Sequence, residues 1–582
     1  MKQIKKLGFA LLMALTVVSC MDLDINNNPD TPSSQTGSVS TRLPGVSFWM
    51  GQTYQTSGFF GALINQQITL SNRGDRYGSL AEWTAANNTA ALYPYQAFFV
   101  GVGGTLADIY AMAEKEGAYH YMAISKLYRA MGFMVLADDL GEMSYLGALG
   151  SDLNPDYDDG KTIFYGCLDE LEQAIELFKK TQEPGATPLS AGDNWNQGDV
   201  NKWIKLCYGL KARWLNNLTK KAEYNADEVL AALANAPQSN AESTVINHED
   251  SDPNNTDNLW GDPVKQSYVW IWLCNWSRTY YVTKWYADIL TNFDGKGIVD
   301  PRADKLIPSA QVGSDKHWLR STGVDMQSDI RIGTNWTTPG PGVYSTATGT
   351  WSGDSAFISL RVSSTASPYT TVVADGTNIN SGTFYVRPEA PTHFLCYPEM
   401  CFIKAEALFR KGDKSGAFTA YKDGVKAHID LLNVHLSKWN DPSNIAKTPI
   451  SDADRDSYLN TALGTANDLT LGKIMTQKFI ALSFSHQSWN DMRRLDYGLA
   501  SGVAPGAYPG WAEPYERTSG YNDSYKMYIP ENKQYRRLAW VSHEFNYNNA
   551  KLAASHPHQL QTNIVSYPVW FDYPNDNYLN AE

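Results

Sequence analysis

Residues 398–432, PEMCFIKAEALFRKGDKSGAFTAYKDGVKAHIDLL, decide the fold of this chain. They hold two amphipathic helical patterns, separated by Lys411-Gly412-Asp413. The second pattern places four apolar side chains at helical spacing, so that one stripe can be buried: Ala417, Tyr421, Val425 and Leu432. Because the break is short, the two helices must run antiparallel. The stretch therefore predicts a helical hairpin of tetratricopeptide size.

The composition of the whole chain limits what the protein can bind. Its 582 residues are enough for a large core and more than one subdomain. The formal net charge of −13 argues against nucleic acid as a partner, because phosphates repel an acidic surface. Aromatic residues make up 12% of the chain, with 18 Trp and 34 Tyr, which is more than a core requires. We expect some of these rings to lie on a surface, where they fit an uncharged ligand.

The first 44 residues predict a lipoprotein leader followed by a tether. A basic start and an apolar run end at Val17-Val18-Ser19-Cys20, which has the form of a lipobox. We predict that residues 1–19 are a signal peptide and that Cys20 carries the lipid; the alternative is a plain signal peptide with an incidental cysteine. Residues 20–44 are polar and lack a hydrophobic period, so they predict a flexible tether. No later run has the length of a membrane span, so the lipid is the only predicted membrane contact.

Residues 45–582 are predicted to form a single, mainly α-helical domain. Apolar stripes at helical spacing indicate helices near residues 46–70, 124–135, 164–178 and 203–214. Residues 236–395 instead form a loop-rich insertion with little helical period. Strand-like runs at 355–362 and 383–386 predict short strands inside it. A long irregular stretch inside a domain is usually functional, so we expect the ligand to contact this insertion.

Sugar recognition needs flat aromatic faces for the C–H surfaces of the ring and polar groups for the hydroxyls. Residues 71–88 offer both in one polar loop, and the insertion offers further rings as a second wall. The predicted aromatic contacts are Trp83, Trp336, Tyr344, Trp351 and Trp318. The predicted polar contacts are Arg73, Asp75, Asn87 and Asn88. The competing interpretation is that each Trp anchors a core or a loop.

Motifs for catalysis and for cofactors are missing from the sequence. There is no Gly-rich phosphate loop, no zinc-protease helix and no G-x-S-x-G elbow, and we expect no cofactor. Asp138 and Asp139 form an acidic pair at a helix end, for which solvation or capping is the better interpretation than glycoside hydrolysis. The stretch D-P-N-N-T-D-N (252–258) lacks the acidic spacing of a calcium loop, so no metal site is predicted. Cys167 and Cys207 lie on apolar stripes and are expected to be buried thiols.

Several motifs resemble those of the SusD/RagB family of outer-membrane nutrient-binding lipoproteins, and they occur in the family's order. They are A-D-D-L-G-E-M-S-Y (137–145), the K-W helix at 198–215, D-P-R (300–302), the A-E-A-L-F hairpin at 405–421, W-x-D-x-x-R (489–494) and the closing R-R-L-A-W (536–540). Ser144 and Val541 stand where the family usually has Pro. Asp491 and Arg494 are three residues apart, so they can pair on one helix face as a structural clasp.

The resemblance implies a scaffold of four tetratricopeptide-like hairpins with a ligand site built from loops and small strands. It also implies that the protein acts as the lid of a SusC-like TonB-dependent transporter in the outer membrane, capturing an oligosaccharide without cleaving it. Three alternatives remain open: a peptide or other nutrient as ligand, a helical glycoside hydrolase, and a tetratricopeptide adaptor that binds only proteins.

Overall fold

The structure is a computed structural model. It describes residues 37–70, 77–84, 89–152, 154–249, 280–312, 317–327, 343–345, 350–352, 381–387, 389–514 and 533–581, together with Ile358, Leu360 and Ile529. None of the helices in these ranges is both long enough and apolar enough to cross a membrane.

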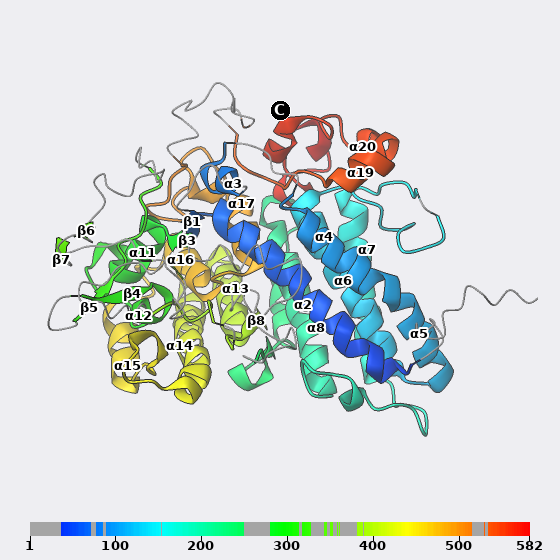
Figure 1. Ribbon diagram of the computed structural model, residues 1–582, viewed down its shortest axis with the longest axis horizontal. Helices are drawn as coiled ribbons and strands as arrows, with labels where there is room; N and C mark the ends of the chain where they lie inside the picture. Colours follow the sequence, from blue (N-terminus) through cyan, green and yellow to red (C-terminus); the bar gives the residue numbers. More distant parts are fainter. Residues whose placement is uncertain are drawn as a thin grey trace, which may run out of the picture.

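The described chain is mainly α-helical, as the sequence predicts. Two groups of helices lie on either side of the long helix α2, which crosses the front of the molecule in Figure 1. The N-terminal group and α2 have these bounds: α2 (Val39–Ile64), α3 (Gly78–Glu82), α4 (Leu92–Phe98), α5 (Gly104–Glu116), α6 (Tyr119–Leu140), α7 (Gly160–Lys179), α8 (Val200–Asn217) and α9 (Ala226–Leu233). The remaining helices are α11 (Lys284–Thr291), α12 (Ala303–Leu306), α13 (Tyr397–Arg410), α14 (Lys414–Trp439), α15 (Asp452–Thr461), α16 (Leu471–Ala481), α17 (His486–Arg494), α19 (Ser542–Tyr547) and α20 (Asn549–Ser555).

Helices adjacent in the chain pack as antiparallel pairs, which gives the tetratricopeptide-like character. The most extensive pairs are α5 with α6, α6 with α7, α8 with α9, and α13 with α14. Helix α17 packs on α2, and α13 contacts α8, α9 and α16. These cross-contacts join the two groups into one core.

The hairpin predicted from residues 398–432 is confirmed as α13 and α14. All four residues of the predicted stripe are fully buried. Gly412 adopts φ +84°, a left-handed conformation that glycine tolerates, and it ends α13. The Asp413 carboxylate then accepts a hydrogen bond from the Gly416 N–H at 2.8 Å and caps α14. The turn chemistry in the sequence thus fixes where both helices end and begin.

The N-terminal helix begins earlier than the sequence predicts. Ser38 forms a capping box with Thr41, and α2 starts at Val39. Residues 39–44 therefore belong to α2, with Val39 and Leu43 fully buried, and the predicted boundary of the tether at 44 is wrong. The predicted signal peptide and Cys20 lie outside the described residues.

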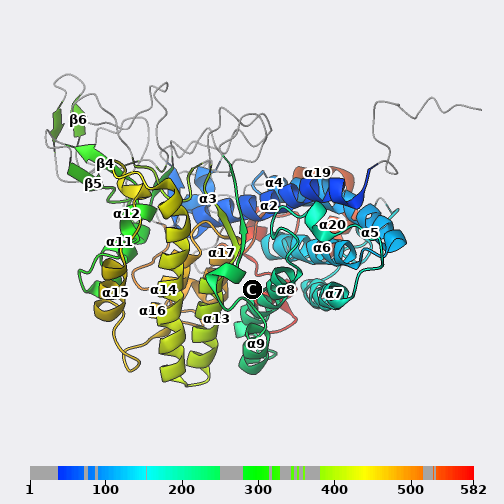
Figure 2. The ribbon, with the colours of Figure 1, turned by 90° about the horizontal axis from the view of Figure 1, so that it is seen from below.

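In the described ranges the strands are short and form four two-stranded antiparallel sheets. Their pairs are β1 (Ile68–Leu70) with β3 (Tyr280–Val282), β2 (Thr244–Ile246) with β8 (Thr392–Leu395), β4 (Ser309–Val312) with β5 (His317–Arg320), and β6 (Val343–Ser345) with β7 (Thr350–Ser352). All of them except β1 come from the predicted insertion. Strands β4, β5 and β6 lie at the same edge of the molecule as α3, whereas the far ends of α9, α13 and α14 reach the opposite side (Figure 2).

The two predicted strand runs do not form strands in the part of the chain that the structure describes. Residues 383–387 form a turn, and of residues 355–362 only Ile358 and Leu360 are described, neither of them in a strand. Phe384 and Val386 are apolar because they cover the core, where both are buried. The Phe384 N–H donates to the Lys305 carbonyl at 2.7 Å, which holds the turn against α12.

Buried ion pairs fasten the segments that carry the recognised motifs. Arg302 donates to both carboxylate oxygens of Asp300 in the D-P-R turn, and both side chains are fully buried. Arg537 of the closing segment donates to Glu142 at 2.7 Å and to the Leu140 carbonyl at 3.2 Å, at the end of α6. The first pair fixes the turn itself, whereas the second joins two segments almost 400 positions apart.

A further cluster holds the C-terminal segment to the scaffold. The Asp496 carboxylate accepts hydrogen bonds from Lys220 and Arg536, each at 2.5 Å, and from the Val503 N–H at 2.8 Å. Asp572 pairs with the same two cations. Although burial opposes ionisation of Asp496, these cations outweigh it and lower the pKa of the carboxyl to about 2.

This pKa predicts a defined acid sensitivity. A depressed folded-state pKa stabilises the fold above the unfolded value of 3.8, and that stability is lost as pH falls from about 4 through 2. The shift corresponds to about 2 kcal/mol. Denaturant unfolding of Asp496→Asn should show a deficit of that size at pH 7 and a smaller one at pH 3. An equal deficit at both pH values would contradict the assignment.

Candidate ligand-binding site

Trp83 does not form an exposed platform, and this part of the predicted site is wrong. Its side chain is fully buried, and its indole Nε1–H donates to the Ile64 carbonyl at 2.9 Å. Tyr497 and Trp511 pack against the ring, with centroids 4.9 and 5.7 Å away. These neighbours come from a segment more than 400 positions later in the chain, so the local sequence could not reveal them.

Trp318 has the partial exposure that a ligand contact requires. It lies on β5, where its register partner is Gln311 of β4, and its side chain is partly exposed. Leu319 packs on the small apolar cluster of Ala310 and Ile358. Because successive strand residues alternate between faces, Trp318 lies on the opposite face from that cluster.

Tyr344 and Trp351 are brought together by the pairing of β6 and β7. They occupy directly opposite positions in the antiparallel ladder. The backbone register therefore places these two predicted contacts next to each other on neighbouring strands. The sequence separated them by seven positions and gave no sign of the turn that pairs them.

The remaining predicted contacts lie outside the described residues. They are Trp336, Arg73, Asp75, Asn87 and Asn88. The described residues contain no group of three His, Cys, Asp or Glu side chains that could hold a metal ion, and the 252–258 stretch is not among them.

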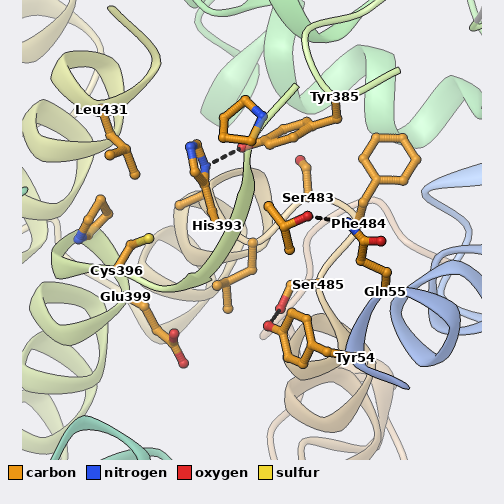
Figure 3. Close-up of a pocket in the computed structure, with 15 residues that line it drawn as sticks. Tyr54, Gln55, Tyr385, His393, Cys396, Glu399, Leu431, Ser483, Phe484 and Ser485 are labelled. Atoms are coloured by element: carbon orange, nitrogen blue, oxygen red, sulfur yellow. Dashed lines mark hydrogen bonds between the residues drawn. The ribbon is translucent and has the colours of Figure 1, made fainter. Parts of the chain in front are cut away.

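A small pocket lies between α2, β8, α13 and the turn at residues 482–485 (Figure 3). The Tyr54 hydroxyl bonds to Ser485 Oγ at 2.5 Å, and the Tyr385 hydroxyl lies 3.3 Å from His393 Nδ1. Burial lowers the pKa of His393 to about 3, so the imidazole is neutral at pH 7. The space that a water-sized molecule can occupy is about 40 Å³. The pocket is therefore too small for a sugar unit, and its polar groups instead join α2 to the turn before α17 and to β8.

The acidic pair at the end of α6 is buried, so its interpretation as solvated is wrong. The Asp138 carboxylate lies 3.0 Å from His486 Nε2 and accepts a hydrogen bond from Asn490 at 2.6 Å. Ser57 Oγ lies 2.5 Å from the other ring nitrogen of His486. Ser57, His486 and Asp138 are hydrogen-bonded in the sequence Ser–His–Asp, as in a catalytic triad. All three side chains are buried where α2, α6 and α17 meet. Their geometry serves packing between these helices.

Two larger cavities lie beside the insertion. One, of about 430 Å³, opens between α12, β5 and α15, and the other, of about 320 Å³, lies between α11 and α16. Both fall in the size range of small-molecule sites, roughly 300–1,000 Å³. The sequence did not reveal them, because each is lined by segments that are far apart in the chain.

Comparison with known proteins identifies the class to which this scaffold belongs. Residues 54–508 match the SusD-like family described as "Starch-binding associating with outer membrane". The chain belongs to this SusD-like family. No curated protein sequence matches the chain.

Solved structures of similar fold include several SusD-like proteins. A SusD/RagB family protein from Bacteroides thetaiotaomicron superposes with a TM-score of 0.63 at 17% identity, covering 93% of this chain and 100% of that one. A SusD homologue from Bacteroides fragilis gives 0.64 at 17% identity, covering 92% and 100%. A chitin-binding protein gives 0.64 at 18% identity, with the same coverage. At these identities the likeness establishes the fold.

Proposed function

We propose that this protein is a lipid-anchored outer-membrane lipoprotein that binds an oligosaccharide and delivers it, uncleaved, to a SusC-like TonB-dependent transporter. Its family is described as starch-binding and associated with the outer membrane, which supports the glycan and the location. The main structural support is the aromatic insertion: partly exposed Trp318 and the paired Tyr344 and Trp351 lie on two hairpins at one edge of the scaffold.

This arrangement suits a protein that binds a glycan without cleaving it. Flat rings on short hairpins can stack on sugar faces, and a net charge of −13 disfavours polyanionic ligands. In this proposal the helical surface away from these hairpins contacts the transporter. The lipid on Cys20 anchors the protein to the membrane. Co-purification from native membranes with a TonB-dependent barrel, lost on Cys20→Ala, tests the anchor and the partner together.

The ligand is tested by calorimetry of the protein without its first 36 residues. The panel should hold maltoheptaose and soluble starch, chitohexaose, other plant and host glycans, and a set of mixed peptides. We expect binding to at least one glycan, with the sugar recovered intact. Binding only to peptides would replace the glycan proposal, and cleavage of a glycan by the pure protein would contradict the carrier role.

Trp318→Ala should weaken glycan binding about fivefold to tenfold, because a stacked ring contributes about 1 kcal/mol or more. Tyr547→Ala is the matched control, since Tyr547 is a 79% exposed aromatic residue on α19, away from the insertion. Calorimetric titration of both variants with the same glycan measures the difference. Equal affinities in the two variants would exclude Trp318 from the site.

A further inference from the structure

The 430 Å³ cavity beside β5 has a wall built from one face of helix α15. Asp454, Ser457, Tyr458 and Thr461 line it, at spacings of three, four and seven residues that put them on the same helix face. Asp454, Ser457 and Thr461 are exposed, whereas Tyr458 is buried. The cavity therefore has an open polar mouth and an aromatic residue deeper inside.

The opposite wall carries charged groups from α12 and β5. Arg320 pairs through Nε with Asp304, and both side chains line the cavity. Lys305 is buried and donates to the Ile445 carbonyl at 2.6 Å and to Thr448 Oγ1 at 2.8 Å. These side chains present donors and acceptors close together.

The charges of the lining cancel. Asp300 lines the cavity as well, but Arg302 already binds both of its oxygens. Among the lining residues that the structure describes, the remaining charged side chains are Asp304 and Asp454 against Lys305 and Arg320. A balanced set of hydrogen-bonding groups favours a neutral ligand with many hydroxyls over an anion or a cation.

Strand β5 links the cavity to Trp318. Trp318 and Arg320 are two residues apart on this strand, so they lie on the same face, and Arg320 lines the cavity. An aromatic ring next to a guanidinium–carboxylate pair can bind one sugar unit: the ring stacks on the face of the sugar, and the charged pair forms hydrogen bonds with its hydroxyls.

We propose that the cavity between α12, β5 and α15 is a subsite for one neutral sugar unit of the bound glycan, with Asp304 and Arg320 holding its hydroxyls and Trp318 at its edge. This inference rests on the proposed glycan-binding function. It adds a defined subsite to that function, built from segments near residues 300, 320 and 455.

Two variants test the subsite by different means. Ser457→Phe places a ring at the exposed mouth on α15 and blocks entry without touching the ion pair. Asp304→Asn keeps the shape and removes the carboxylate charge. The probes are maltoheptaose and chitohexaose, titrated calorimetrically into the wild type and each variant. We expect at least tenfold weaker binding of the recognised oligosaccharide in both variants.

Asp294→Asn is the matched control, because Asp294, like Asp304, pairs with a cation, Lys473 at 3.0 Å, but lines the other cavity between α11 and α16. It should bind like the wild type. Wild-type affinity in both test variants, or a loss only in Asp294→Asn, would overturn the subsite while leaving glycan binding intact. A wild type that binds neither oligosaccharide would overturn the subsite, and the full glycan panel then decides the proposed function separately.

Discussion

Replacing Arg494 by alanine should destabilise the protein by about 3–5 kcal/mol, because it removes the buried cation that two buried carboxylates share. The Arg494 guanidinium donates to both oxygens of Glu406, each at 2.7 Å, and to Asp491 at 2.7 and 2.9 Å. All three side chains are buried. Glu406 lies on α13 and Asp491 on α17. Removing the Arg494 side chain therefore breaks a link between the α13–α14 hairpin and α17, the helix that packs on α2.

Arg410→Ala provides the comparison within the same cluster. Arg410 also binds Glu406, at 3.0 Å, but its side chain is 27% exposed and it lies one helical turn away on α13. Because the Arg410 head stays in contact with water and Arg494 still holds Glu406, we expect Arg410→Ala to cost less than about 1 kcal/mol. Urea unfolding of both variants measures the contrast. Similar losses in the two variants would mean that burial does not decide the strength of this cluster.

The hairpin and the clasp could be predicted from the sequence because both are local. Apolar spacing and a Lys-Gly-Asp break specify α13 and α14, and the three-residue spacing specifies the Asp491–Arg494 pair. Cys167 and Cys207 are free and buried, as their place on apolar stripes predicts. The third member of the clasp, Glu406, is 88 positions from Arg494, and no local pattern links the two.

The candidate site could be predicted only in part, because its residues depend on contacts between distant segments. The seven positions between Tyr344 and Trp351 do not reveal that the two are paired. The cavity beside β5 joins residues near 300, 320 and 455, which no periodicity connects. Trp83 was predicted to be exposed because its neighbours in the sequence are polar. In the structure, Tyr497 and Trp511 from the C-terminal part of the chain cover it.

Trp83→Ala should cost about 3–5 kcal/mol of stability, which is the usual range for removing a buried tryptophan. The change leaves a cavity beside Tyr497 and Trp511 and removes the donor to the Ile64 carbonyl. Trp83 also has φ +57°, a left-handed conformation that is unfavourable for a bulky residue. Packing must hold it there, because nothing in the side chain itself favours that backbone conformation.

The comparison with Trp318→Ala separates a structural tryptophan from a binding one. Urea unfolding and glycan titration should be measured on both variants. We expect Trp83→Ala to lose stability while its folded fraction binds glycan normally, and Trp318→Ala to lose affinity while its stability falls by less than about 1 kcal/mol, as for a surface substitution. If Trp83→Ala instead kept its stability and lost binding, the ring would have to leave the core on binding, and the assignment of Trp83 to the core would fail.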